Sequence, residues 1–168
     1  MKTLKQEVDT VEEKTFSSPQ IQRFIPNSKW ILYSSLKNIL NLKLFMRGKR
    51  NLLILLDPPN SRIGHFVLLI LKSHNEAIFF DPYGNSLQKL LRILDLPDFL
   101  PRLLKSYRVI SNINQFEVLK PKIQTCGRWC VIRGIFSNMS NLEFSKFMKF
   151  KNVKSDELAV LLTYCFLN

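Results

Sequence analysis

Histidine and cysteine, the residues on which most nucleophilic and metal chemistry depends, are scarce in this sequence. Its 168 residues include two histidines and three cysteines. An odd number of cysteines argues against a small secreted domain held together by disulfides. Cys126 and Cys130 lie four positions apart, without the two-residue gap of zinc ribbons, and a closed zinc site needs four ligands. We therefore expect no structural metal.

Long apolar runs are also absent. The longest, residues 66–71, has six residues, whereas a transmembrane helix requires about 20. The first lysines are followed by acidic residues and not by the apolar stretch of a signal peptide. We expect a protein that neither spans a membrane nor is secreted.

Acidic residues are few beside basic ones, 13 against 25, which gives a net charge of +12. Such a balance favours acidic partners such as nucleic acid. Residues 1–20 hold three lysines and four acidic residues, so the positive charge belongs to the rest of the chain. Because this segment also has few large apolar side chains and ends in turn residues, we predict a loosely ordered arm over 1–20 and a single domain over 21–168.

The order of expected elements indicates an α+β domain. Short apolar runs bounded by turn residues predict strands at 52–56, 66–71, 77–80, 107–110 and 116–119. Helical spacing and capping residues predict helices over 28–47, from Ser86 to before Pro97, from Cys126, from Ser140 and from Ser155.

The two histidines differ in their surroundings. His74 lies in a polar turn, where an exposed histidine is expected. His65 directly precedes the apolar strand 66–71, so a single polar side chain lies at the mouth of a buried element. Position alone leaves two interpretations of His65 open: a histidine that is hydrogen-bonded to backbone at a strand end, and a functional base.

Cys126 lies where a polar loop enters a helix. The unpaired amides and the positive dipole of a helix start favour a thiolate there. Gly127 would let a substrate backbone approach the sulfur. The alternative is a small, buried, apolar cysteine. That alternative suits Cys130 and Cys165, which both fall inside amphipathic helices.

Asp81 ends the predicted strand 77–80 and begins the sequence Asp-Pro-Tyr-Gly, which is typical of a turn. It also follows His65 by one hairpin, so its carboxylate could orient the imidazole. Because side chains alternate along a strand, the two residues share a face only if an odd number of loop residues separates Leu71 from Ala77. A regular loop of even length would point Asp81 away.

Three segments together carry a resemblance. Residues 64–69 (Gly-His-Phe-Val-Leu-Leu), 78–84 (Ile-Phe-Phe-Asp-Pro-Tyr-Gly) and 125–130 (Thr-Cys-Gly-Arg-Trp-Cys) occur in this order. They resemble the signature of the adenovirus-type and ubiquitin-like-protein-specific cysteine proteases. The last two strings are most similar to the maturation proteases of virophages and Maverick/Polinton-type elements. The resemblance covers residues 64–138.

This resemblance implies a papain-like fold of the adenovirus-protease type, in which a central mixed sheet is packed by helices. It implies that Cys126 is the nucleophile at a helix N-terminus, that His65 is its general base and that Asp81 is the partner of the base. The tryptophan that usually follows the histidine in this family is Phe66 here, which we expect to cover the imidazole.

The resemblance further implies an oxyanion hole that is built from a glutamine side chain and the amide of the nucleophile. The family's glutamine lies shortly before the cysteine, where this chain has Glu117 and Lys120. Gln124, two residues before Cys126, and Gln115, further upstream, are the candidates for this role.

The function that follows is a cysteine endopeptidase that cleaves capsid or other virion precursor proteins during particle maturation. We expect it to act as a monomer without a required cofactor, in the virion and the interior of the host cell, with duplex DNA as a partner and candidate activator. One alternative is a deubiquitinase or ubiquitin-like-tag protease. Another is a non-enzymatic, basic, DNA-binding core protein of the virion, which the lysine cluster over 146–154 would suit.

The positive charge generates a prediction. The protein should bind duplex DNA with little sequence preference, because lysines and arginines release counterions from the phosphates. For about six phosphate contacts, the affinity should fall about a thousandfold or more between about 50 and about 200 mM salt. Fluorescence anisotropy on a labelled duplex measures this. Binding that is absent at the lower salt concentration, or that does not vary with salt, would contradict the prediction.

Overall fold

The computed structural model describes residues 17–59, 64–118, 124–149 and 153–167, without the side chains of 165–167. Its centre is a sheet of five strands in the order β1-β2-β3-β4-β5. The strands are β1 (Ser28–Leu32), β2 (Asn51–Leu56), β3 (His65–Leu71), β4 (Glu76–Phe80) and β5 (Arg108–Ser111). The sheet is mixed, because the outer pairs β1–β2 and β4–β5 are parallel and the inner pairs β2–β3 and β3–β4 are antiparallel.

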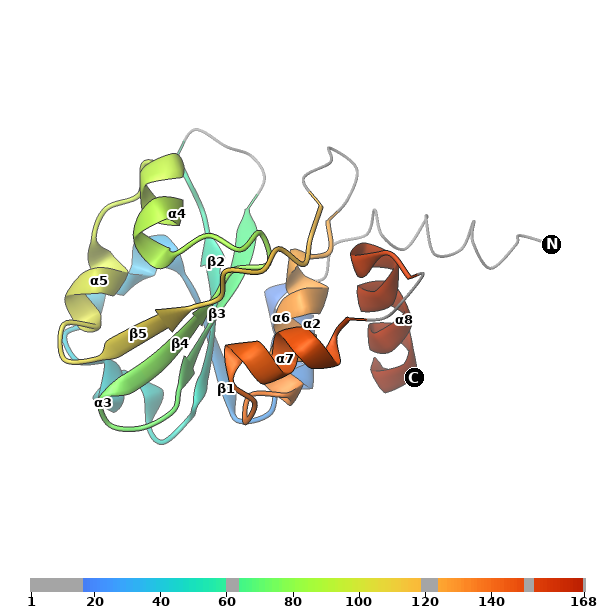
Figure 1. Ribbon diagram of the computed structural model, residues 1–168. Helices are drawn as coiled ribbons and strands as arrows, with labels where there is room; N and C mark the ends of the chain where they lie inside the picture. The colour runs from blue at the N-terminus through green and yellow to red at the C-terminus, as the bar shows by residue number, and fades with distance from the viewer. Residues whose placement is uncertain (1–16, 60–63, 119–123, 150–152, 168) are drawn as a thin grey trace.

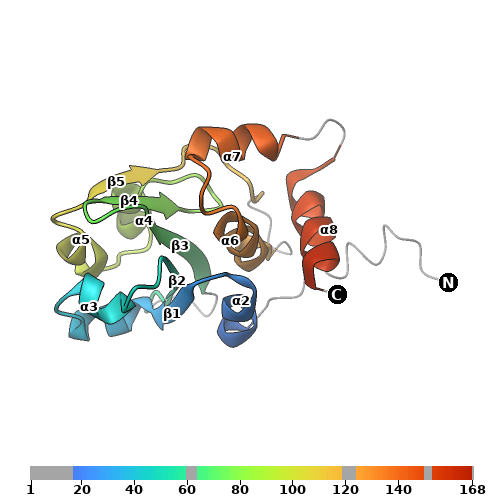
Figure 2. The ribbon, with the colours of Figure 1, turned by 90° about the horizontal axis from the view of Figure 1, so that it is seen from below.

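Helices cover both faces of this sheet, as Figures 1 and 2 show. One face carries α2 (Ser18–Phe24), α6 (Cys126–Ile135), α7 (Asn141–Phe147) and α8 (Ser155–Leu167). The other carries the 3₁₀ helix η1 (Tyr33–Asn38), α3 (Leu42–Met46), α4 (Leu87–Ile93) and α5 (Phe99–Leu103). The prediction of an α+β domain with a helix-packed mixed sheet is confirmed.

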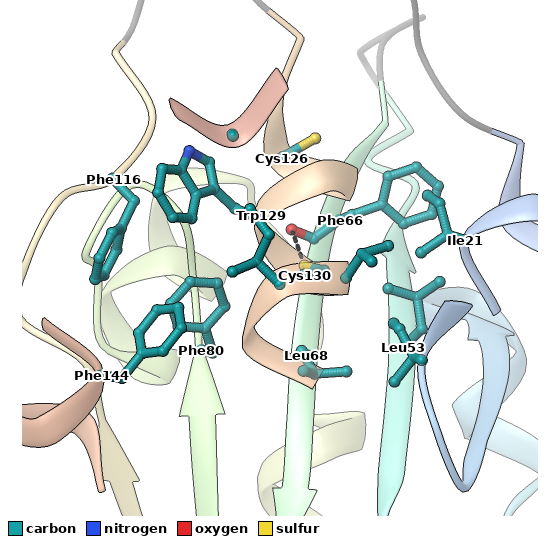
Figure 3. Close-up of a cluster of buried hydrophobic side chains, with 14 of the residues drawn as sticks. Ile21, Leu53, Phe66, Leu68, Phe80, Phe116, Cys126, Trp129, Cys130 and Phe144 are labelled. Atoms are coloured by element: carbon teal, nitrogen blue, oxygen red, sulfur yellow. Dashed lines mark hydrogen bonds between the residues drawn. The ribbon is translucent and has the colours of Figure 1, made fainter. Parts of the chain in front are cut away.

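Strand β3 separates two apolar cores because its side chains alternate between the faces. Phe66, Leu68 and Ile70 pack toward α6 in one core, whereas Val67 and Leu69 belong to the other. Figure 3 shows the first core, in which α6 packs against the face of the sheet. Because both faces are covered, residues 66–71 of β3 form an uninterrupted apolar run, as the sequence indicates.

The helix predicted over 28–47 is wrong. Residues Ser28–Leu32 form β1 and pair in parallel with Asn51–Leu55 of β2, and only the short helices η1 and α3 follow. The spacing of large apolar residues in this segment fits a helix, but it does not reveal a strand partner more than twenty residues away. Pairing with β2 satisfies the backbone groups of Ser28–Leu32 that face β2 and selects the extended form.

The strand predicted over 116–119 is also wrong for its described residues. The amides of Phe116 and Glu117 both donate to the carbonyl oxygen of Pro82, at 2.8 and 3.0 Å. Two neighbouring amides that share one acceptor cannot form a strand ladder, in which successive amides point to opposite sides. Residue 119 lies outside the described part of the chain.

The other predicted elements are found close to their expected positions. Ser86 caps α4 by accepting the amide of Lys89, and Ser140 forms a capping box with Glu143 at the start of α7. Strand β5 begins one residue later than predicted, while α2 and α5 were not predicted.

The boundary expected between residues 20 and 21 falls inside α2, and residues 1–16 of the expected arm lie outside the described residues. In the described part of the chain, no helix has the length and hydropathy needed to cross a bilayer.

Close packing of α6 on the end of α2 generates a prediction. A Cβ on Gly134 would lie 2.5 Å from Cγ2 of Ile25, a methyl group on the branched Cβ that cannot move far from the backbone. Gly134→Ala should therefore destabilise the fold by about 1–3 kcal/mol through overpacking. Urea unfolding measures the change.

A double-mutant cycle supplies the control. Ile25→Ala removes the clashing carbon, so Gly134→Ala should cost much less free energy of unfolding in that background. Strictly additive effects of the two substitutions would show that this contact does not limit the approach of α2.

Candidate active site

The hairpin formed by β3 and β4 brings His65 and Asp81 together. Leu71 pairs with Ala77, so five residues, 72–76, lie between the two paired positions. This odd number places the two side chains on the same face, which confirms the expected hairpin geometry. His65 Nε2 lies 2.6 Å from Asp81 Oδ1. His74 lies exposed within residues 72–76, as predicted.

The carboxylate of Asp81 is fully buried and is held by the turn that it begins. Oδ1 also accepts the amide of Tyr83 at 3.1 Å, and Oδ2 accepts the backbone amide and the side-chain amide of Asn85 at 3.0 and 2.9 Å. Burial opposes its ionisation, but His65 and these donors outweigh burial and hold the pKa of Asp81 below its usual value. Asp81 is thus both a turn residue and the partner of the imidazole.

The imidazole of His65 lies at the end of the sheet, with 12% of its side chain exposed. Burial by itself lowers its pKa, but the hydrogen bonds and charges of Asp81 and Cys126 raise that pKa to about 10. His65 is therefore cationic at neutral pH. Its ring stacks on Tyr83, with centroids 4.6 Å apart and planes 19° apart. The expectation that Phe66 covers the imidazole is wrong, because Phe66 follows His65 in the strand and points into the core beside α6.

Cys126 is the first residue of α6, as the sequence predicts. Its sulfur, a ring nitrogen of His65 and a carboxylate oxygen of Glu117 all lie within 4.8 Å of one another. Because Asp81 binds Nε2, Nδ1 is the ring nitrogen that is available to the thiol. In Figure 3 the sulfur of Cys126 points away from Cys130, one helical turn below.

Cys130 is a core residue, as expected. It is completely buried and its thiol donates to the carbonyl oxygen of Phe66 at 3.5 Å. Burial raises the pKa of Cys130 well above its usual value, so this thiol is unreactive at neutral pH. The side chain of Cys165 lies outside the described residues, and its predicted role is untested.

Helix α8 binds the described residues on either side of segment 119–123. Asp156, at the start of α8, accepts the amide of Val118 at 3.0 Å and the hydroxyl of Thr125. Farther along the two helices, Arg128 donates to the hydroxyl of Thr163 at 2.6 Å. The nucleophile therefore begins a helix whose entry and body are both attached to the C-terminal helix.

Glu117 is a site residue that the analysis of the sequence did not assign. It is completely buried, and Oε1 accepts the amide of Thr125 at 3.0 Å. Oε2 has no hydrogen-bond partner within the described chain. Burial is the largest influence on this carboxyl and raises the pKa of Glu117 to about 7. Its signal in the sequence was its position in the window where the resembled family has a glutamine.

The glutamines considered for an oxyanion hole are placed differently. Gln115 is exposed, its amide donates to the carbonyl oxygen of Glu117 at 2.8 Å, and it lines a surface cavity with residues of α7 and α8. Gln124 is half-buried two residues before Cys126. The expectation that Gly127 lets a substrate backbone approach the sulfur is wrong. A Cβ on Gly127 would lie 2.7 Å from Cδ1 of Ile21, so this position faces α2. This glycine permits the packing of α2.

The only described residues that could hold a metal ion together are His65, Glu117 and Cys126. Three ligands are one fewer than a closed structural zinc site requires. The sequence-based expectation that the protein has no metal site remains a prediction.

Comparison with known proteins adds one relative and two structural likenesses. No protein-family model matches the sequence. Uncharacterized protein V9 of Sputnik virophage is 29% identical over 125 residues, covering 66% of this chain and 71% of that protein. ChlaDub1 from Chlamydia trachomatis has a TM-score of 0.43 and 15% identity over 97% of this chain and 76% of that one. AvrA delL154, solved with IP6 and CoA, has a TM-score of 0.36 and 13% identity, over 83% and 51%. TM-scores below 0.5 carry no information about activity.

The pairing of His65 with Asp81 generates a prediction that NMR titration can measure. The pKa of His65 should lie near 10 and should fall by about one to three units in Asp81→Asn, because the opposing charge is lost while burial persists. The exposed His74 is the other histidine of the chain, and its signal should not differ between the two proteins. An unchanged His65 titration in Asp81→Asn would contradict the electrostatic role of the carboxylate.

Proposed function

We propose that this protein is a cysteine endopeptidase of the adenovirus-protease type, with Cys126 as nucleophile, His65 as acid and base, and Asp81 as the group that orients His65. The observation that carries the proposal is the arrangement of these side chains. A thiol at a helix start faces an imidazole whose other nitrogen lies 2.6 Å from a buried carboxylate. This arrangement suits acyl transfer through a thioester.

The first half-reaction would form the acyl-enzyme. Cationic His65 stabilises the Cys126 thiolate, whose sulfur attacks the scissile carbonyl carbon while the π electrons move to the carbonyl oxygen. When the tetrahedral intermediate collapses, the carbon–nitrogen bond breaks. His65 gives its proton to the leaving amine, which departs with a free amino terminus. Asp81 keeps Nε2 occupied, so Nδ1 remains aimed at the sulfur.

The second half-reaction would restore the enzyme. Neutral His65 takes a proton from water as the water oxygen attacks the thioester carbon. Collapse of the second tetrahedral intermediate breaks the carbon–sulfur bond and releases the carboxylic acid. Cys126 returns as a thiolate beside protonated His65.

Virion precursor proteins are the substrates that we propose. The motif around Cys126 resembles that of virophage maturation proteases, and the relative described above is a virophage protein. Action inside the virion or the infected cell, as a monomer and without a required cofactor, belongs to the same proposal. Duplex DNA as a partner rests on the net charge of +12, and DNA as an activator rests on the resemblance to adenovirus-type enzymes. A ubiquitin-like substrate would use the same three side chains.

The nucleophile can be tested by substitution. Cys126→Ala should lower cleavage of a capsid precursor by about 10⁴-fold or more while the thermal unfolding temperature stays nearly constant, because the change removes the attacking sulfur and little packing. Iodoacetamide should label Cys126 rapidly at neutral pH in the wild-type protein. The same assay with a ubiquitin-like fusion distinguishes the two substrate classes.

Cys130→Ala is the matched control. It should lower stability and keep turnover, because Cys130 is buried against β3. If Cys130→Ala abolishes cleavage in a folded protein, or if Cys126→Ala retains it, the assignment of the nucleophile is wrong.

A further inference from the structure

The buried acid Glu117 has one oxygen that the fold does not use. Oε1 accepts the amide of Thr125 at 3.0 Å, while Oε2 is buried and has no hydrogen-bond partner within 3.5 Å in the described chain. The carboxyl lies within 4.8 Å of both the sulfur of Cys126 and a ring nitrogen of His65. An unpaired polar atom in a buried position is costly unless a ligand completes its hydrogen bonding. The free oxygen at this place indicates a role in the reaction.

We propose that Glu117 acts as a carboxylic acid whose Oε2–H donates a hydrogen bond to the carbonyl oxygen of the substrate as that oxygen becomes negative. This inference rests on the proposed function and supplies its missing oxyanion donor. The amide of Cys126 also faces this carboxyl and would be the second donor. Both donors then surround the position that the oxyanion reaches when the sulfur attacks.

The protonation state follows from the groups that face Glu117 on each side. Burial favours the neutral acid, and the carboxylate of Asp156 in α8 favours it further. Cationic His65 in β3 and the amides of Thr125 and Cys126 favour the ionised form. The hydroxyl of Tyr83, in the turn after β4, also points to the Glu117 carboxyl as a hydrogen-bonding neighbour, and burial together with that carboxyl raises the pKa of Tyr83. The balance leaves the pKa of Glu117 near 7.

Neutrality is what makes the side chain useful. An ionised carboxylate would repel the developing oxyanion and has no proton to donate. A protonated acid has the same shape as glutamine and presents one donor and one acceptor, so Oε1 can keep Thr125 while Oε2 serves the substrate. Gln115 does not compete for this role, because its amide is already bound to a backbone oxygen.

A pH dependence follows from this assignment. Acyl transfer should fall as pH rises through about 7, because Glu117 loses its proton there. The Cys126–His65 pair should persist over the same range, because the pKa of His65 is about 10. Loss of activity on the alkaline side should therefore occur while the thiol remains reactive.

Two variants test the role. Glu117→Gln keeps a neutral donor and the acceptor for Thr125 at every pH, whereas Glu117→Met has a similar length and no donor. The probe is p-nitrophenyl acetate, whose attack by Cys126 creates an oxyanion. Iodoacetamide provides the comparison, because alkylation of the same sulfur creates none. Thermal unfolding of all three proteins reports their folding.

If Glu117 is the donor, Glu117→Gln should stay within about threefold of wild type at pH 6 and exceed it at pH 8.5, since the alkaline loss near pH 7 disappears. Glu117→Met should lower kcat by about 10²–10³-fold with little change in KM. Alkylation rates should agree within about threefold among the three proteins.

If Glu117→Gln is as slow as Glu117→Met, or retains the alkaline loss, the inference is overturned. Wild-type protein that shows neither an acylation burst nor rapid alkylation would instead overturn the proposed function and this inference with it.

Discussion

Burial of the Asp81 carboxylate is the constraint on which the site depends. A charged group without solvent must find donors, and Asp81 finds them in His65, in the amide of Tyr83 and in Asn85. The turn that supplies these bonds also needs Gly84, whose φ of 76° is unfavourable for other residues. Because the same carboxylate satisfies the turn and orients the imidazole, the position of His65 follows from the folding of its own hairpin.

The turn after β4 also positions residues 114–117, the segment that carries Glu117. The carbonyl oxygen of Pro82 accepts the amides of Phe116 and Glu117, and a Cβ on Gly84 would come within 3.0 Å of the backbone of Asn114. Asp156 accepts hydrogen bonds from Val118 and Thr125, the described residues on the two sides of segment 119–123. Asp81 therefore positions Glu117 through the turn that contains Pro82, and Asp156 positions it through Val118 and Thr125.

The buried acids Asp81 and Glu117 differ because their hydrogen-bond partners differ. Asp81 receives four hydrogen bonds and faces a cation directly, so its pKa falls despite burial. The carboxyl of Glu117 faces only the backbone amides of Thr125 and Cys126 and a more distant cation, so burial dominates and its pKa rises to about 7. One pocket can therefore hold a permanent anion that positions the base and a neutral acid that is suited to stabilising an oxyanion.

The sequence by itself determined the features that depend on near neighbours along the chain. These include the hairpin that unites His65 with Asp81, the caps of α4 and α7, and the helix start at Cys126, because turn chemistry and residue alternation are local. Only the tertiary structure decided that 28–32 is a strand, that Tyr83 and not Phe66 stacks on the imidazole, and that Glu117 lies beside the thiol. The strand at 28–32 and the place of Glu117 depend on contacts between distant segments, which residue spacing does not specify. The stacking of Tyr83 depends on the course of the turn after β4, which alternation along the strands does not specify.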